Sequence, residues 1–168
     1  MPLPLLTDRL GIRAYDPDDA TQMHEVLYRD PVAMRYVGGP RTFAETTQQV
    51  RGYAEDHVRR GYACWVVEER ETGLIVGEAG LHPFDSKGPE IELAYAFGRP
   101  FWGRGFATEA ARAIVAEGFG DLGLEEIVAV ARDENTASLH VLENLGFVQD
   151  GRRFAWGHDH PFFRLRRS

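Results

Sequence analysis

Residues 98–120 of the chain read GRPFWGRGFATEAARAIVAEGFG, and the fold can be worked out from them in both directions. The apolar run EIELAYAF before them predicts a strand, and apolar residues from Phe106 onward recur at helical spacing. Gly103 and Gly105 lie between the two elements and permit left-handed backbone conformations that turn N–H groups outward. The first turn of a helix has unpaired N–H groups and a positive dipole, so this stretch predicts a seat for a phosphate or pyrophosphate.

Two common phosphate-binding patterns do not fit this loop. A dinucleotide fingerprint needs a third glycine where the chain has Thr108, and a P-loop needs Gly-Lys-Ser/Thr. Two glycines also occur in strand-to-helix connections that bind nothing. The loop alone therefore leaves both an anion site and a plain turn open.

The composition is that of one ordinary domain, and we expect residues 1–168 to form a single unit with a real core. A net charge of −7 disfavours nucleic acid as a partner and favours a cationic one, such as an amine. Cys64 is the only cysteine, and its apolar neighbours predict a core position. The sequence has neither a signal peptide nor an apolar run of membrane length, which predicts a cytoplasmic protein without a membrane partner.

The periodicity of the chain predicts the order β-α-α-β-β-β-α-β-α-β-β. Helices are expected over 20–29, and from Thr42 or Phe43 to a stop at Gly61, with an apolar face of Phe43, Thr47, Val50, Tyr53 or Ala54, and Val58. Strands are expected at 62–69, 74–81, 90–97 and 127–130. A helix capped by Asn135 follows, and the tail predicts a hairpin that turns at 157–161. Together these elements predict an α+β domain with a mixed sheet and helices on both faces.

Five segments, in this order, resemble the GNAT superfamily of acetyl-CoA-dependent N-acetyltransferases. They are LTDRLGIRAYDPDDA, RDPVAMRYVG, WVVEERETGLIVGEAGL, FWGRGFATEA and NTASLHVLENLGF. Within the superfamily the chain is most similar to the RimJ/RimL-like branch of ribosomal-protein N-terminal acetyltransferases. This resemblance covers nearly the whole chain. It implies a mostly antiparallel sheet in which one pair of strands splays apart.

The resemblance also implies where acetyl-CoA would lie. Pantetheine would pair with the backbone of Tyr95, Ala96 and Phe97, and Asn135 and Ser138 would border its thiol end. The pyrophosphate would contact the Thr108 hydroxyl and the backbone N–H groups of Trp102, Gly103, Arg104, Gly105, Phe106 and Ala107. Two positions depart from the superfamily pattern: Pro100 stands where Arg or Gln is usual, and Leu142 stands where a tyrosine often serves as the acid.

Acetyl transfer to an amine needs a group that accepts the amine's proton, and a donor near the leaving thiolate can assist. Glu92 is the candidate base, because it lies on the strand predicted to hold pantetheine. The alternative is that Glu90 and Glu92 are both solvated. Ser138 is the candidate donor to the sulfur, and the alternative is a helix serine that satisfies local backbone groups.

Other polar side chains near these segments leave two readings open. Arg99 and Arg104 either contact phosphates or are simply exposed, and His82 either approaches the amine or is structural. His158 and His160 flank Asp159, but without further ligands at suitable spacing they predict a solvated turn and no metal site.

The expected activity is direct acetyl transfer from acetyl-CoA to a primary amine. A protein or peptide N-terminal α-amine is the favoured acceptor. A small-molecule amine, such as an antibiotic or polyamine, is the alternative, and a non-catalytic acetyl-CoA-binding module is a further one. Phe162 and Phe163 leave open whether their strand contributes to the core or to a homodimer contact.

Overall fold

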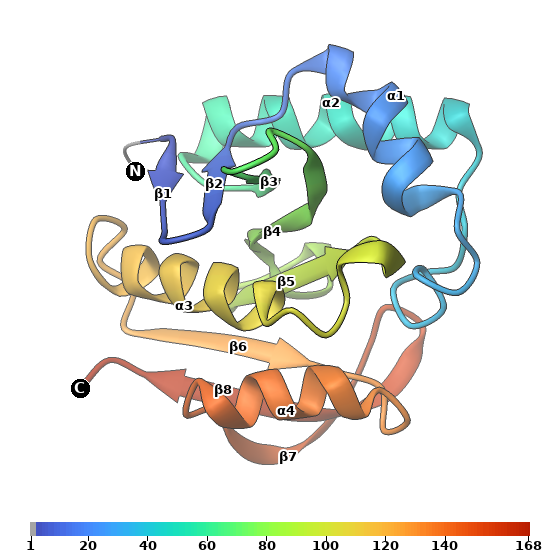
Figure 1. The fold of residues 1–168 in the computed structure, drawn as a ribbon. Helices are drawn as coiled ribbons and strands as arrows, with labels where there is room; N and C mark the ends of the chain where they lie inside the picture. The colour runs from blue at the N-terminus through green and yellow to red at the C-terminus, as the bar shows by residue number, and fades with distance from the viewer. Residues whose placement is uncertain (1–2) are drawn as a thin grey trace.

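The structure is a computed structural model that describes residues 3–168. Eight strands form one sheet in the order β1-β2-β3-β4-β5-β6-β8-β7 (Figure 1). Every neighbouring pair is antiparallel except β5 and β6, which run parallel. The strands are β1 Leu5–Leu6, β2 Leu10–Arg13, β3 Cys64–Glu69, β4 Ile75–Pro83, β5 Ile91–Phe97, β6 Glu126–Val130, β7 Val148–Ala155 and β8 His158–Arg166.

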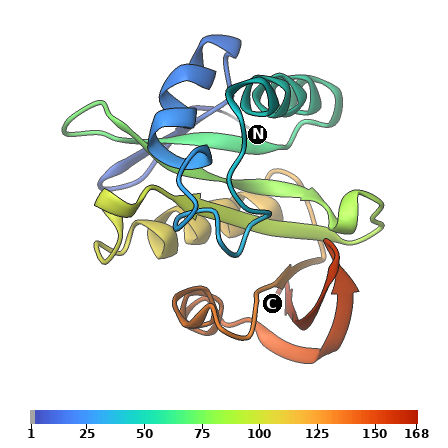
Figure 2. The same ribbon diagram turned by 90° about the vertical axis from the view of Figure 1, so that its right-hand side faces the viewer.

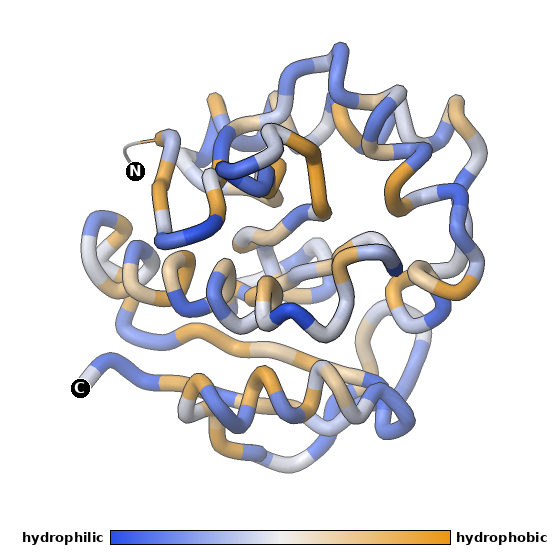
Figure 3. Tube along the Cα trace, in the orientation of Figure 1, coloured by the Kyte–Doolittle hydropathy of each residue, from blue (hydrophilic) through white to orange (hydrophobic). Residues whose placement is uncertain are grey.

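The helices cover both faces of the sheet, which confirms the predicted α+β architecture. They are α1 Ala20–Met23, which continues into a π-helical segment His24–Tyr28, then α2 Phe43–Arg60, α3 Phe106–Phe119 and α4 Thr136–Asn144. One hydrophobic core lies between the sheet and α3 and α4, and a second lies beneath α1 and α2 (Figures 1 and 2). Apolar residues alternate with polar ones along α3 and α4, as expected for helices with one buried face (Figure 3). Among residues 3–168, no helix is long and apolar enough to cross a membrane.

Helix α2 begins and ends where the sequence predicts, and the middle of its predicted face is the part that packs: Val50 is buried, and Tyr53 and Ala54 are partly buried against the same core. The Thr42 and Glu45 side chains form a capping box at its start, and Gly61 ends it at φ 81°. Phe43 and Val58, however, are 51% and 85% exposed, and the buried residues of α2 are Thr46 and Val50. The prediction was therefore wrong at the two ends of the face, because packing against β3 and α1 covers the middle of the helix and leaves Phe43 and Val58 in solvent.

The C-terminal hairpin is longer than predicted. Its turn is Trp156-Gly157, and 158–161 belong to β8 rather than to the turn. The reason is that residues 158–161 pair with residues 152–155 of β7, and this ladder holds a polar segment extended. Phe162 is buried within a third small cluster, as the core alternative predicted. The short strand β1 was not expected, because two residues carry no periodicity.

The splayed strand pair implied by the family resemblance is present. Strands β5 and β6 share a single register pair, Glu92 with Val128, and separate beyond it. In the view of Figure 2, β6, β7, β8 and α4 form a block set apart from the upper part of the sheet. On the edge away from β4, the end of β5 is thereby left without a neighbouring strand, and the candidate site lies there.

Candidate active site

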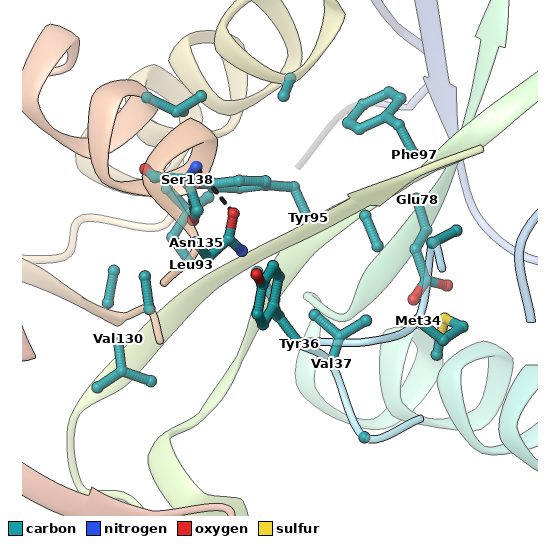
Figure 4. Close-up of a pocket in the computed structure, with 18 of the residues that line it drawn as sticks. Met34, Tyr36, Val37, Glu78, Leu93, Tyr95, Phe97, Val130, Asn135 and Ser138 are labelled. Carbon is teal, nitrogen blue, oxygen red and sulfur yellow. Dashed lines mark hydrogen bonds between the residues drawn. The ribbon is translucent and has the colours of Figure 1, made fainter. Parts of the chain in front are cut away.

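A cavity of about 1240 Å³ occupies the splay between β5 and β6. All the predicted site residues line it except Arg104: Glu92, Tyr95, Ala96, Phe97, Trp102, Gly103, Gly105, Phe106, Ala107, Thr108, Asn135 and Ser138. Figure 4 shows Tyr95 and Ser138 on one side of β5, and Met34 and Tyr36 on the other. The cavity therefore extends to both sides of β5. Two reactants can enter such a cavity from opposite sides and meet beside this strand.

The loop before α3 has the geometry predicted for an anion seat. Gly103 and Gly105 adopt φ of 74° and 78°, where side chains other than glycine are strained. Side chains of Thr42 and Asn135 cap α2 and α4, whereas no side chain described in the structure caps the start of α3. The first-turn N–H groups of α3 therefore remain available to a ligand at the mouth of the cavity.

The two arginines near this loop bind carboxylates of the protein. Arg104 pairs with the buried Glu69, and its guanidinium lies 4.4 Å from the centre of the Phe106 ring. Arg99 pairs with Asp30. The Arg104 side chain thus braces the loop from outside the cavity. Both arginines are exposed, as the second reading predicted, and each is also paired with a carboxylate of the protein.

The loop is also tied to the end of β5. The indole Nε1–H of Trp102 donates to the carbonyl oxygen of Phe97 at 2.7 Å. This bond fixes the position of the loop relative to β5, and it uses one of the backbone groups on the stretch predicted to pair with pantetheine.

Ser138 is held by β5 as well as by its own helix. The Asn135 carboxamide oxygen accepts the Ser138 N–H at 3.2 Å, and the Ser138 hydroxyl lies 2.9 Å from the Tyr95 hydroxyl (Figure 4). Burial raises the pKa of Tyr95 to about 12, so its hydroxyl keeps its proton. The reading of Ser138 as a purely local serine is wrong. Sequence reasoning missed the Tyr95 side chain, because only the fold brings it to α4.

Glu92 is buried, and the solvated reading of this residue is wrong. Its exposure is 5%, and its carboxylate accepts a hydrogen bond from the Trp156 indole at 2.9 Å. Burial raises the pKa of Glu92 to about 8, although the bond from Trp156 lowers it. Glu90, two residues away, pairs with Arg153, which holds the pKa of Glu90 below its usual value. Glu92, unlike Glu90, therefore has a pKa suited to proton transfer near neutral pH.

Histidine side chains border Glu92 but form no metal site. The His82 Nδ1 lies 3.8 Å from a Glu92 oxygen, and its ring meets the Trp156 ring edge to face. Burial lowers the pKa of His82 and also that of His160, so both are neutral near pH 7. Within the part of the chain that the structure describes, no three His, Cys, Asp or Glu side chains are grouped to hold a metal ion.

Glu78 is a second buried carboxylate of the cavity that sequence reasoning missed. It is 7% exposed and accepts hydrogen bonds from the Tyr15 hydroxyl at 2.5 Å and the Tyr28 hydroxyl at 2.7 Å. Burial raises the pKa of Glu78. Tyr28 ends the π-helical segment, a type of helix distortion that is frequent at functional sites. The sequence does carry a signal for Glu78. It is a glutamate at an inward-facing position of the otherwise apolar strand 75–83, and the alternation of side chains along a strand is enough to mark it as unusual.

A split sheet with a helix start at its mouth and a deep cavity beside it is the arrangement of an acetyltransferase that uses acetyl coenzyme A. The chain belongs to the GNAT family: residues 9–148 match the family model described as acetyltransferase (GNAT) domain. The membership confirms the resemblance drawn from the five sequence segments, and the protein is an acetyltransferase.

Three known proteins are similar to this chain in sequence or in fold. An uncharacterised protein of Bacillus subtilis, YkkB, is 31% identical over 143 residues, which cover 84% of this chain and 83% of YkkB. An FsC-acetyl coenzyme A-N(2)-transacetylase of Aspergillus fumigatus is 32% identical over 132 residues, 73% of this chain and 55% of that protein. The structure of RimL, a ribosomal L7/L12 alpha-N-protein acetyltransferase in complex with coenzyme A, has a TM-score of 0.81 at 18% identity and covers 98% of this chain and 97% of RimL.

Proposed function

We propose that this acetyltransferase moves the acetyl group of acetyl-CoA directly to the N-terminal α-amine of a protein or peptide, in a complex that holds both reactants. The observation that carries the proposal is Glu92, a buried carboxylate with a pKa of about 8 on the wall of the cavity. RimL, a protein with the same fold, is a ribosomal-protein α-N-acetyltransferase, and this supports a protein α-amine as the acceptor.

The loop and the start of α3 fit the phosphates of acetyl-CoA. Uncapped N–H groups of the first turn, with the Thr108 hydroxyl, hold the pyrophosphate, and the free edge of β5 at Tyr95–Phe97 receives pantetheine. Acetyl-CoA supplies an acetyl group activated as a thioester. Pantetheine bound along this edge would bring the thioester into the splay, where the alternate residues Glu92, Ala94 and Ala96 share one face of β5.

Glu92 accepts the proton that the ammonium group must lose before its nitrogen can attack. An unperturbed α-amino group has a pKa of about 8, and a lysine ε-amino group has one of about 10.4. Proton transfer to Glu92 is thus nearly balanced for an α-amine, because the carboxylate has a pKa of about 8. The same transfer from a lysine side chain costs about 3 kcal/mol. This match favours an α-amine over a lysine side chain.

Ser138 and Tyr95 act at the other end of the reaction. Their hydroxyls lie 2.9 Å apart, and Tyr95 stays protonated. We assign Ser138 as the donor to the leaving thiolate and Tyr95 as the donor to Ser138. Tyr95 would then replace the family tyrosine that is absent at Leu142. A thiol with a pKa of roughly 8.5 leaves without full protonation, so the pair contributes less than Glu92 does.

The test is a steady-state assay of thiol release with acetyl-CoA and short peptides that have a free or a blocked N-terminus. We expect turnover only with the free α-amine, and intersecting rather than parallel lines when both substrates are varied. Glu92→Gln should lower kcat/KM at least about tenfold and remove the titration near pH 8 from the kcat profile. Glu90→Gln, the matched control, should keep both. A Glu92→Gln profile equal to that of the wild type would remove Glu92 from the mechanism, and no turnover with any amine would support the binding-module alternative.

A further inference from the structure

Four carboxylates are buried in the part of the chain that the structure describes, and they fall into two pairs. Asp19 bonds to Arg13 at 2.8 Å and Glu69 pairs with Arg104. Neither Glu78 nor Glu92 has an arginine or lysine nitrogen of residues 3–168 within 4.0 Å. The two carboxylates without such a partner both line the cavity, whereas the two paired ones do not.

An ionised buried carboxylate without a partner destabilises a protein, so such a group keeps its proton, in line with the raised pKa of Glu78, until a cation binds beside it. Hydrogen bonds from Tyr15 and Tyr28 orient the Glu78 carboxylate but bring no positive charge. Arg41 acts on Glu78 only at a distance, because its guanidinium lies 5.6 Å from the centre of the Tyr28 ring and donates to Gln49 at 2.8 Å. Among residues 3–168, no arginine or lysine is therefore in direct contact with the Glu78 carboxylate.

The two carboxylates face the same side of the sheet at separate places. Ala96 of β5 lies opposite Glu78, and Glu92 lies opposite His82. Directly opposite residues share a face, as do alternate residues along a strand, so Glu78 and Glu92 both face the side covered by α1 and α2. Four residues of β5 separate the two positions, or about 13 Å at a rise of about 3.3 Å per residue. A single amine does not span that distance.

We propose that Glu78 binds a second cationic group of the acceptor, the basic side chain of a residue near the N-terminus of the peptide, while the α-amine faces Glu92. The assignment of Glu92 rests on the proposed function, whereas the Glu78 site rests on burial and missing partners. The rings of Tyr28 and Tyr53 also line this part of the cavity and favour a cation beside the carboxylate. A lysine or arginine at positions 2 to 4 of an extended peptide reaches the required distance.

The experiment compares acceptors that differ only in the second charge. Peptides with lysine at position 2, 3 or 4 and an N-terminal alanine are paired with the same peptides containing norleucine. Octane-1,8-diamine is paired with octylamine, so that a small diamine and a peptide are distinguished as sources of the cation. Each acceptor is assayed for kcat and KM with acetyl-CoA, and for binding to the protein saturated with coenzyme A by calorimetry. The variants are Glu78→Gln and Glu68→Gln, a control on β3 outside the cavity.

We expect the lysine peptide to be favoured over its norleucine partner by about tenfold or more in KM, with kcat little changed. Glu78→Gln should abolish that preference, and Glu68→Gln should keep it. A preference confined to the diamine would overturn the peptide as the source of the cation. Equal values for both members of every pair in the wild type would overturn the cation site, even if Glu78→Gln failed to fold. If no acceptor turned over, the proposed function would fail, and binding by calorimetry would still decide the cation site.

Discussion

The raised pKa of Glu92 predicts that this residue makes the stability of the protein depend on pH, and Glu92→Gln tests this without any knowledge of the acceptor. In the unfolded chain a glutamate ionises near its ordinary value of 4.5, whereas folded Glu92 holds its proton up to a pKa of about 8. Between these values the folded state binds one proton more than the unfolded state. The stabilising contribution is full below the unfolded pKa and is lost as the pH rises through the folded pKa.

The size of the effect follows from the two pKa values of Glu92. With a folded pKa of about 8, the linkage contribution to the free energy of unfolding falls by about 3 kcal/mol between pH 5.5 and 8.5. Glutamine has no such titration and keeps an oxygen that accepts the Trp156 bond. The difference in free energy of unfolding between the wild type and Glu92→Gln should therefore fall by about 3 kcal/mol over this range.

The assay is urea unfolding at 25 °C for both proteins at four pH values from 5.5 to 8.5, at fixed ionic strength. Subtracting the two free energies of unfolding cancels the contributions of groups common to both proteins. These include the buried histidines, whose lowered pKa values make stability rise with pH below pH 6.5. Glu90→Gln is the control: Arg153 holds the pKa of Glu90 below 4.5, so its contribution is constant above pH 5.5 and its difference should be flat. A flat difference for Glu92→Gln as well would show that Glu92 is ionised throughout, and the argument for its role as base would lose its support.

Three further predictions concern the loop, the sheet and the hydroxyl pair. Thr108→Ala should raise the Kd of acetyl-CoA about three- to tenfold in calorimetry with no change in urea unfolding, and an unchanged Kd would take the Thr108 hydroxyl out of the phosphate seat. Gly80→Ala should destabilise the protein by more than about 2 kcal/mol, because the added Cβ would lie 2.1 Å from the Ala63 carbonyl oxygen. Gly52→Ala within α2 has no atom within 4 Å and should stabilise by about 0.5–1 kcal/mol, so equal urea midpoints for the two variants would contradict the packing described. Tyr95→Phe and Ser138→Ala should each lower kcat, and the double variant should lose less than the sum of both; additive losses would mean that the hydroxyls act separately.

Much of the fold could be predicted from the sequence because its signals are local. The capping box at Thr42 and the left-handed glycine at Gly61 define α2, and Asn135 caps α4, within a few residues of chain. The pair Gly103 and Gly105 predicts the loop geometry in the same way, because a positive φ depends on the residue itself. The splay between β5 and β6 was predicted from the five segments that resemble the family in order. The periodicity of the sequence does not reveal it.

The chemistry of the cavity depends on contacts between residues that are distant in the chain, and only the tertiary structure decided it. Glu92 and Glu90 look alike in sequence, but Trp156 covers one while Arg153 pairs with the other. Glu78 becomes a buried, unpaired carboxylate only because Tyr15 and Tyr28 close over it from 63 and 50 residues away. A pKa reports the solvent and charges around a group, and these are assembled by folding. The sequence by itself therefore determined the class of enzyme and the position of the loop predicted to hold phosphate, and the fold determined which carboxylates line the cavity.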